Sequence, residues 1–215
     1  MMKPLRANSS MFQTLVAFIS ANPGSARKFK STAIDSQEYR EKLERKFIEG
    51  RSPRAPEKPK TVPDSVVSII LEDYFGEKPS DIEEIKRTHL LAMAAENTVG
   101  DLLERYLASV LESHGWVWCS GSVTKSIDFI KHNPGQSPEW VCLQVKNRDN
   151  SENSSASAVR NGTNIEKWFR TFSRTGKTNW DKFPDISARN QLSESGFRNF
   201  VKNYIKAINS SASER

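Results

Sequence analysis

The apolar positions along the chain change their period near residue 116, which predicts helices before that point and strands after it. Between Thr98 and about Ser113, apolar residues recur every three or four positions, the period of one helix face. They are Val99, Leu102, Leu103, Tyr106, Leu107, Val110 and Leu111. Thr98 with Asp101 can begin this helix, and His114-Gly115 can end it. The stripe therefore predicts a helix packed against a core.

Three short segments beyond residue 115 have the composition of strands. They are rich in Val, Ile, Phe and Trp, are separated by Ser/Gly turns and Asn133-Pro134-Gly135, and cover residues 116–119, 125–131 and 140–146. We expect a mixed or antiparallel sheet packed on the preceding helix, and thus an α/β (α+β) fold. The spacing of aromatic and aliphatic residues predicts two further helices over residues 165–174 and 197–208.

Residues 1–63 are predicted to form a helical arm followed by a proline-rich connector. An amphipathic segment covers residues 11–20, and Ser36 can cap a helix that stops at Gly50. Four prolines among basic residues make 51–63 an extended connector. Helices are then expected from Asp64, which can act as a cap, and from about residue 81. Residues 64–215 are expected to carry the chemistry.

The composition, 36% hydrophobic and 27% charged, is that of an ordinary soluble domain. No stretch reaches the roughly 20 apolar residues of a membrane span, so no membrane partner is expected. Two cysteines, Cys119 and Cys142, are too few for a disulfide framework. They lie on predicted strands that could be neighbours, so a bridge is possible, although a reduced pair in the cytoplasm is the expectation.

The charge is uneven. Lys and Arg number 32 against 26 Asp and Glu, and residues 139–215 hold thirteen basic and eight acidic residues, or +5 of the net +6. A basic C-terminal third of the chain suggests a polyanionic partner. Lys and Arg that neutralise phosphates release condensed counterions, which favours binding. A soluble basic surface would have the same balance.

Asp128, Gln144 and Lys146 form the candidate catalytic group. Side chains alternate across a strand, so Gln144 and Lys146 face one way while Val145 faces the core. Asp128 can join them if the preceding strand lies alongside. The two oxygen donors suit a hard divalent cation, and the ammonium can orient water or offset charge on a phosphate. The alternative is that Asp128 ends a strand, Gln144 lies on the surface and Lys146 extends into solvent.

The order helix, strand, strand with Asp128, loop, and strand with Gln144-Val145-Lys146 resembles the PD-(D/E)XK nuclease core. Residues 144–185, QVKNRDNSENSSASAVRNGTNIEKWFRTFSRTGKTNWDKFPD, are similar to the SinI-type restriction endonucleases. The resemblance implies a restriction-endonuclease-like core, a central mixed sheet flanked by helices. It also implies a type II restriction endonuclease that uses Mg²⁺ to cut double-stranded DNA at GGWCC-like sites.

Two positions depart from the nuclease pattern. Ser126-Ile127-Asp128 lacks its proline, and Gln144 replaces its second acid, so the carbonyl can ligate a metal but brings no charge. One unit charge near 4 Å is worth roughly 4 kcal/mol to a cation at an effective dielectric of about 20. We expect another acid to compensate. Glu104 borders the apolar helix stripe and is the candidate, unless it is solvated beside Arg105; Glu96 is the reserve.

Residues that could hold DNA fall in three places. Lys167, Arg170 and Arg174 would share the polar face of the predicted helix over residues 165–174, as a row that follows the phosphate backbone or as a solvated face. The Asn/Ser-rich loop over residues 147–164 directly follows the catalytic strand and contains Asn147, Arg148, Asn150 and Arg160, which could read bases, although a linker would have the same composition. A second candidate loop over residues 174–180 contains Lys177.

Cleavage of both strands at a palindromic site needs two active sites related by a two-fold axis, so we expect a homodimer. The resemblance also implies a bacterial cytoplasmic enzyme with a cognate DNA methyltransferase as functional partner. Two alternatives remain open: a repair or recombination nuclease with the same core, and a non-catalytic DNA-binding module in which Gln144 marks a lost site.

Overall fold

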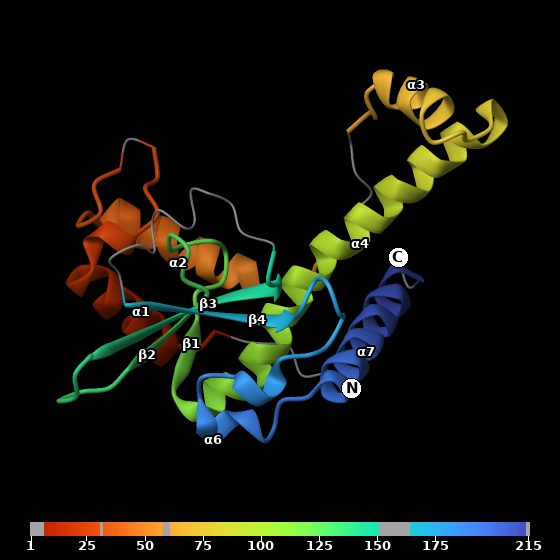
Figure 1. Cartoon of the computed structure of the whole chain (residues 1–215). Coiled ribbons are helices and arrows are strands. Elements are labelled where there is room, and N and C mark those ends of the chain that lie inside the picture. The colour runs from red at the N-terminus through yellow and green to blue at the C-terminus, as the bar shows by residue number, and fades with distance from the viewer. Residues whose placement is uncertain (1–6, 31, 58–60, 151–163, 214–215) are drawn as a thin grey trace. The chain divides into compact units, whose positions relative to one another are not determined.

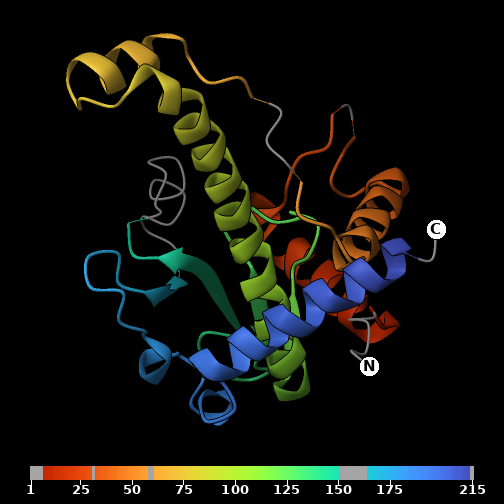
Figure 2. The same cartoon turned by 90° about the vertical axis from the view of Figure 1, so that its right-hand side faces the viewer.

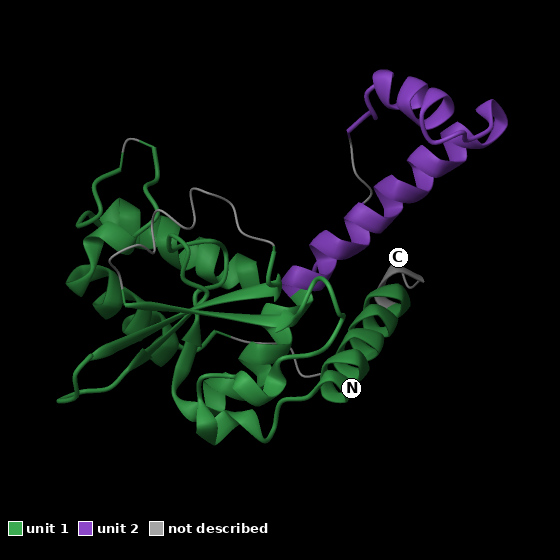
Figure 3. Ribbon diagram, in the orientation of Figure 1, with its two compact units in different colours: residues 1–53, 102–215 green, residues 54–101 purple. Residues whose placement is uncertain are grey.

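The computed structural model describes residues 7–30, 32–57, 61–150 and 164–213. The chain forms two compact units (Figure 3): unit 1 comprises residues 1–53 and 102–215, and unit 2 comprises residues 54–101. This division differs from the expected one at residue 63. The first 53 residues share a unit with the sheet, because the apolar faces of their helices are covered by it.

A four-stranded mixed sheet lies at the centre of unit 1 (Figure 1). It contains the three strands that the sequence predicted and one that it did not, at residues 165–171. Its strands follow in the order β1 (Trp116–Trp118), β2 (Phe129–His132), β3 (Trp140–Arg148) and β4 (Ile165–Thr171). The first two pairings are antiparallel, and β3 pairs with β4 in parallel. The sheet carries helices and so confirms the α/β class.

The predicted helix over residues 165–174 is wrong, because residues 165–171 form β4. The spacing of Ile165, Trp168 and Phe169 fits a helix face, but this strand has partly buried side chains on both faces and so lacks simple alternation. Its parallel pairing with β3 decides the conformation, with Gln144 beside Lys167 and Lys146 beside Phe169.

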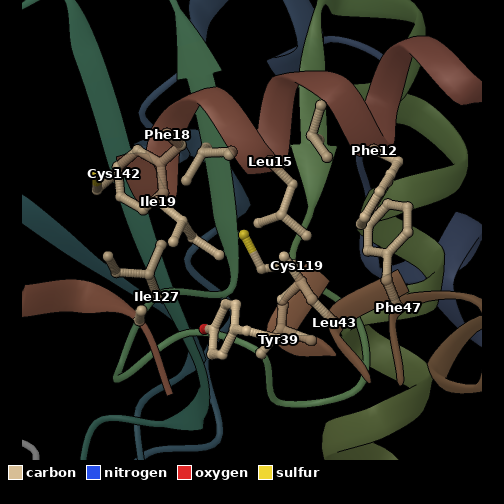
Figure 4. Close-up of a cluster of buried hydrophobic side chains, with 14 residues drawn as sticks. Phe12, Leu15, Phe18, Ile19, Tyr39, Leu43, Phe47, Cys119, Ile127 and Cys142 are labelled. Carbon is tan, nitrogen blue, oxygen red and sulfur yellow. The ribbon is translucent and has the colours of Figure 1, made fainter. Parts of the chain in front are cut away.

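The two N-terminal helices supply about half of a core cluster on the sheet. Helix α1 (Ser9–Ala21) is capped by the Asn8 side chain. Helix α2 (Gln37–Arg51) is capped by the Ser36 side chain, as predicted. Figure 4 shows their apolar residues against those of the strands and of the loop before β2. The cluster is composed of Phe12, Leu15, Phe18, Ile19, Ala26, Tyr39, Leu43, Phe47, Val117, Cys119, Val123, Ile127, Ile130 and Cys142.

Gly50 does not stop α2 as expected, since the helix continues to Arg51. A Cβ atom on Gly50 would lie 2.2 Å from the backbone N of Gly121, and one on Gly121 would lie 2.1 Å from the carbonyl O of Lys46. Helix and loop backbones therefore touch here, and both positions require glycine.

Helix α4 (Pro79–Leu111) merges the two helices expected from residues 81 and 98. Thr98 lies inside it and donates its hydroxyl hydrogen to the Ala94 carbonyl at 2.8 Å. The end is as predicted, with Gly115 in the left-handed region at φ 82° after a short turn, η2 (Glu112–His114). The helix begins in unit 2 and ends in unit 1.

Within unit 1, α7 (Glu194–Ser213) crosses the C-terminal part of α4 (Figure 2). The Tyr106 ring lies 5.6 Å from that of Phe197 and 5.7 Å from that of Phe200, centroid to centroid. The remaining elements are η1 (Pro23–Ser25), η3 (Trp180–Lys182), α6 (Ile186–Arg189) and, in unit 2, α3 (Val66–Asp73).

Cys119 and Cys142 are both free and buried, as expected for a reduced pair. Among the described helices, none is long and apolar enough to cross a bilayer.

Candidate active site

The Asp128 carboxylate sits against β3. Its Oδ2 accepts the backbone N–H of Val145 at 2.7 Å, and its own backbone N–H donates to the Leu143 carbonyl at 2.9 Å. Val145 lies between Gln144 and Lys146, so this bond places the carboxylate beside both residues. The Asp128 carboxylate therefore lies against the backbone of β3 between Gln144 and Lys146, and Asp128 directly precedes β2. The joint catalytic role of the three side chains stays a prediction.

Burial raises the pKa of Asp128 to about 6, because the charged carboxylate loses its hydration. The Val145 N–H and the positive charge of Lys146 both act in the opposite direction. The Lys146 ammonium is therefore close enough to the Asp128 carboxylate to stabilise its charged form. Because burial destabilises the charged form of this carboxyl group, a bound cation would stabilise that form.

Gln144 is only 2% exposed, yet its Oε1 has no hydrogen-bond partner among the described residues. A buried carbonyl oxygen without a partner costs about 1–3 kcal/mol. Most such oxygens in native proteins are paired, so this oxygen is a position where a bound water or cation can supply the partner. An amide oxygen is an acceptable ligand for a hard divalent cation.

A second lysine joins the face that carries Gln144 and Lys146. Lys167 pairs with Gln144 across the parallel β3–β4 ladder, and paired residues point to the same side of a sheet. Arg170 is on the other side, beside Asn147. The predicted row of Lys167, Arg170 and Arg174 is thus wrong as a shared face, because a strand alternates where a helix would align them.

Glu104 is half-buried, and its Oε2 accepts the indole N–H of Trp118 at 2.9 Å. Trp118 pairs with Phe129, the residue after Asp128, so Glu104 is anchored near the start of β2. Its role as the compensating acid stays a prediction. Glu96, the reserve, belongs to unit 2.

The residues present fit a divalent cation with oxygen ligands. One buried carboxylate, that of Asp128, bonds the Val145 N–H of β3, and the preceding residue of β3, Gln144, carries an amide oxygen without a partner among the described residues. Over the described ranges, no group of three or more His, Cys, Asp or Glu forms a ready-made metal cluster. A cation that keeps several waters and shares phosphate oxygens with its substrate can be held by one or two protein carboxylates.

Arg170 and Asn147 belong to a polar network that the sequence did not reveal. The Arg170 guanidinium donates from Nε to Asn147 Oδ1 at 2.9 Å and from one terminal nitrogen to both carboxylate oxygens of Glu194 at 2.8 Å. Trp180 and Arg198 also donate to Glu194. The network connects the end of β3 to β4 and α7 at Asn147, the residue directly after Lys146. Only the correct strand pairing could have predicted it.

The other predicted DNA contacts divide into exposed residues and one undescribed residue. Arg148, Asn150, Arg174 and Lys177 are exposed around the ends of β3 and β4. Asp149 holds this end together, accepting the Ser173 N–H at 2.8 Å. Arg160 lies outside the described residues. Basic side chains therefore surround the C-terminal end of the strand that carries Gln144 and Lys146.

Comparison with known proteins identifies the family. The model of the SinI restriction endonuclease family matches residues 3–207. The type II restriction enzyme Eco47I of Escherichia coli is 52% identical over 204 residues, which is 93% of this chain and 88% of that protein. The type II restriction enzyme SinI of Salmonella infantis is 47% identical over the same extent.

The fold, the site and these matches define the class: the protein is a restriction endonuclease, an enzyme that acts on double-stranded DNA and in general needs a divalent metal. Within that class the chain belongs to the SinI restriction endonuclease family.

Proposed function

We propose that this protein is a magnesium-dependent type II restriction endonuclease that hydrolyses both strands of double-stranded DNA at GGWCC-like sites. The observation that carries the catalytic part is the hydrogen bond from Val145 to the Asp128 carboxylate, which joins the acid to the strand of Gln144 and Lys146. Family membership supports the remainder.

Asp128 and the Gln144 carbonyl would hold Mg²⁺, with Glu104 as the third acid. When bound, the ion lowers the pKa of the attacking water and polarises the scissile phosphodiester. The Lys146 ammonium orients that water and offsets negative charge on the phosphorus oxygens as the leaving oxygen departs. Lys167, on the same face, binds a neighbouring phosphate.

The exposed basic and amide side chains after β3 supply DNA contacts. Arg148 and Arg160 would pair with guanine, and Asn150 with adenine, each pair adding about 1–3 kcal/mol of discrimination. Lys177 and Arg174 contact the backbone. Because the target is palindromic, two copies act together as a homodimer. A cognate methyltransferase protects the host sites in the bacterial cytoplasm.

The experiment compares Asp128→Ala and Lys146→Ala with two control variants, Asp181→Ala and Lys182→Ala, whose side chains are 72% and 75% exposed. We expect the first two to lose cleavage of phage DNA in Mg²⁺ while retaining specific DNA binding, and the controls to cut normally. Sequenced fragment ends report the site and the cut position.

Unaltered cleavage by Asp128→Ala or Lys146→Ala would remove the assignment. Fragments without a common end sequence would favour a structure-directed repair nuclease. Specific retention of DNA without cutting by the wild type would favour a non-catalytic module.

A further inference from the structure

Unit 2 presents large apolar side chains that nothing in it covers. Helix α3 has no buried residue. The exposed fractions of nine apolar residues in unit 2 range from 40% to 89%. We call this set the unit 2 patch; it consists of Val62, Val66, Val67, Ile69, Ile70, Tyr74, Phe75, Leu91 and Met93.

The patch is too large to be incidental. Among the described residues of unit 2, Ile82 is the single buried one, so the unit has almost no core of its own to offset the entropy of its folded chain. If a fully exposed large apolar residue offers about 150 to 250 Å², the nine fractions leave on the order of 900 Å² uncovered. This total is similar to the roughly 800 Å² per partner that a stable protein interface buries.

The net negative charge of unit 2 argues against an anionic partner. Residues 54–101 contain six Lys and Arg against ten Asp and Glu, a net −4, while the rest of the chain carries +10. Such a unit repels a phosphate backbone and an anionic bilayer. The same charge opposes a second copy of the unit, so the apolar contact has to supply the free energy of association. An apolar surface with acidic surroundings in a basic DNA enzyme is suited to a protein partner.

Unit 2 also contains an exposed aromatic pair and a groove. Tyr74 and Phe75 are 82% and 65% exposed, and their rings form a T-shaped pair with centroids 5.1 Å apart. Between α3 and α4 lies a groove of about 480 Å³ within the same unit. Its apolar lining consists of Pro63, Val67, Leu71, Ile85, Leu90 and Met93. A surface that carries both a projection and a groove can pair with itself about a two-fold axis.

We propose that the unit 2 patch is the surface through which two copies of this chain associate, with the Tyr74–Phe75 pair of each copy in the groove of the other. The inference rests on the homodimer of the proposed function and assigns its interface to residues 62–93. The interface lies outside the catalytic strands, so association and chemistry can be lost separately.

The test measures mass by sedimentation, without DNA or Mg²⁺, for the wild type and for Tyr74→Ser/Phe75→Ser. The wild type is expected at twice 24.3 kDa. The double variant is expected as a monomer, with its dissociation constant raised by at least about 100-fold, because two aromatic anchors are lost. Both residues are exposed, so the substitutions remove no buried contact within the chain, and far-UV circular dichroism records any helix that unit 2 loses together with its partner.

Ile186→Ser is the control, since Ile186 is 73% exposed in unit 1 and lies outside the patch; it should stay dimeric. Asp128→Ala should also stay dimeric, which separates failure of the interface from failure of the chemistry. On a plasmid with one site, the double variant should produce nicked circles before linear DNA. A monomeric wild type, or a double variant that remains dimeric, overturns the proposal.

Discussion

Replacing Asp128 by Asn should abolish cleavage and stabilise the metal-free enzyme at the same time. The change keeps the size of the side chain and an oxygen that can accept the Val145 N–H, but it removes the buried charge. Burial raises the pKa of Asp128 from 3.8 to about 6, and each pKa unit corresponds to about 1.36 kcal/mol between the two protonation states. The charged carboxylate therefore destabilises the fold by roughly 3 kcal/mol at pH 8.

The sign of the pH dependence follows from the direction of this shift. A folded-state pKa above the unfolded value means that the native protein binds the proton more tightly. The stability that the native protein gains by binding this proton on Asp128 is thus fully present below about pH 3.8 and is lost as the pH rises through about 6. The advantage of Asp128→Asn over the wild type should be greatest at pH 8 and should shrink to nothing near pH 4.

The assay is urea denaturation followed by tryptophan fluorescence in the presence of a chelator. The five tryptophans, Trp116, Trp118, Trp140, Trp168 and Trp180, all lie in unit 1, so the signal reports the unit that holds the site. Added Mg²⁺ should stabilise the wild type and leave Asp128→Asn unchanged. A variant less stable than the wild type at pH 8 without metal would refute the reasoning.

Three further changes test the site and its support. Gln144→Glu restores an acid beside Asp128, so cleavage should reach half its maximum at a lower Mg²⁺ concentration, measured by titration; an unchanged requirement would argue against Gln144 as a ligand. Glu194→Gln leaves Arg170 without its carboxylate and should cost about 1–3 kcal/mol of unfolding free energy, whereas Glu139→Gln, at a 60% exposed side chain, should cost little. Gly50→Ala should cost about 1–3 kcal/mol or more, since its Cβ would meet the backbone of Gly121; Gly100→Ala, with nothing within 4 Å of its Cβ, should not destabilise. Thermal unfolding of the four variants checks the last two expectations.

The sequence by itself determined the features that depend on local spacing. The apolar stripe predicts the C-terminal part of α4, Ser36 predicts the start of α2, and Gly115 marks a stop that needs positive φ. The strand period predicts that Gln144 and Lys146 share a face. These features follow from backbone geometry over a few residues, so no distant contact is needed to define them.

Tertiary structure decided what depends on partners far along the chain. Residues 165–171 have helix-like spacing, and only pairing with β3 makes them a strand, which moves Lys167 to the face of Gln144 and Arg170 to that of Asn147. The close backbone contact at Gly50 requires Gly121, 71 positions later. The burial that raises the pKa of Asp128 and leaves the Gln144 oxygen without a partner likewise arises only when strands and helices pack and exclude water.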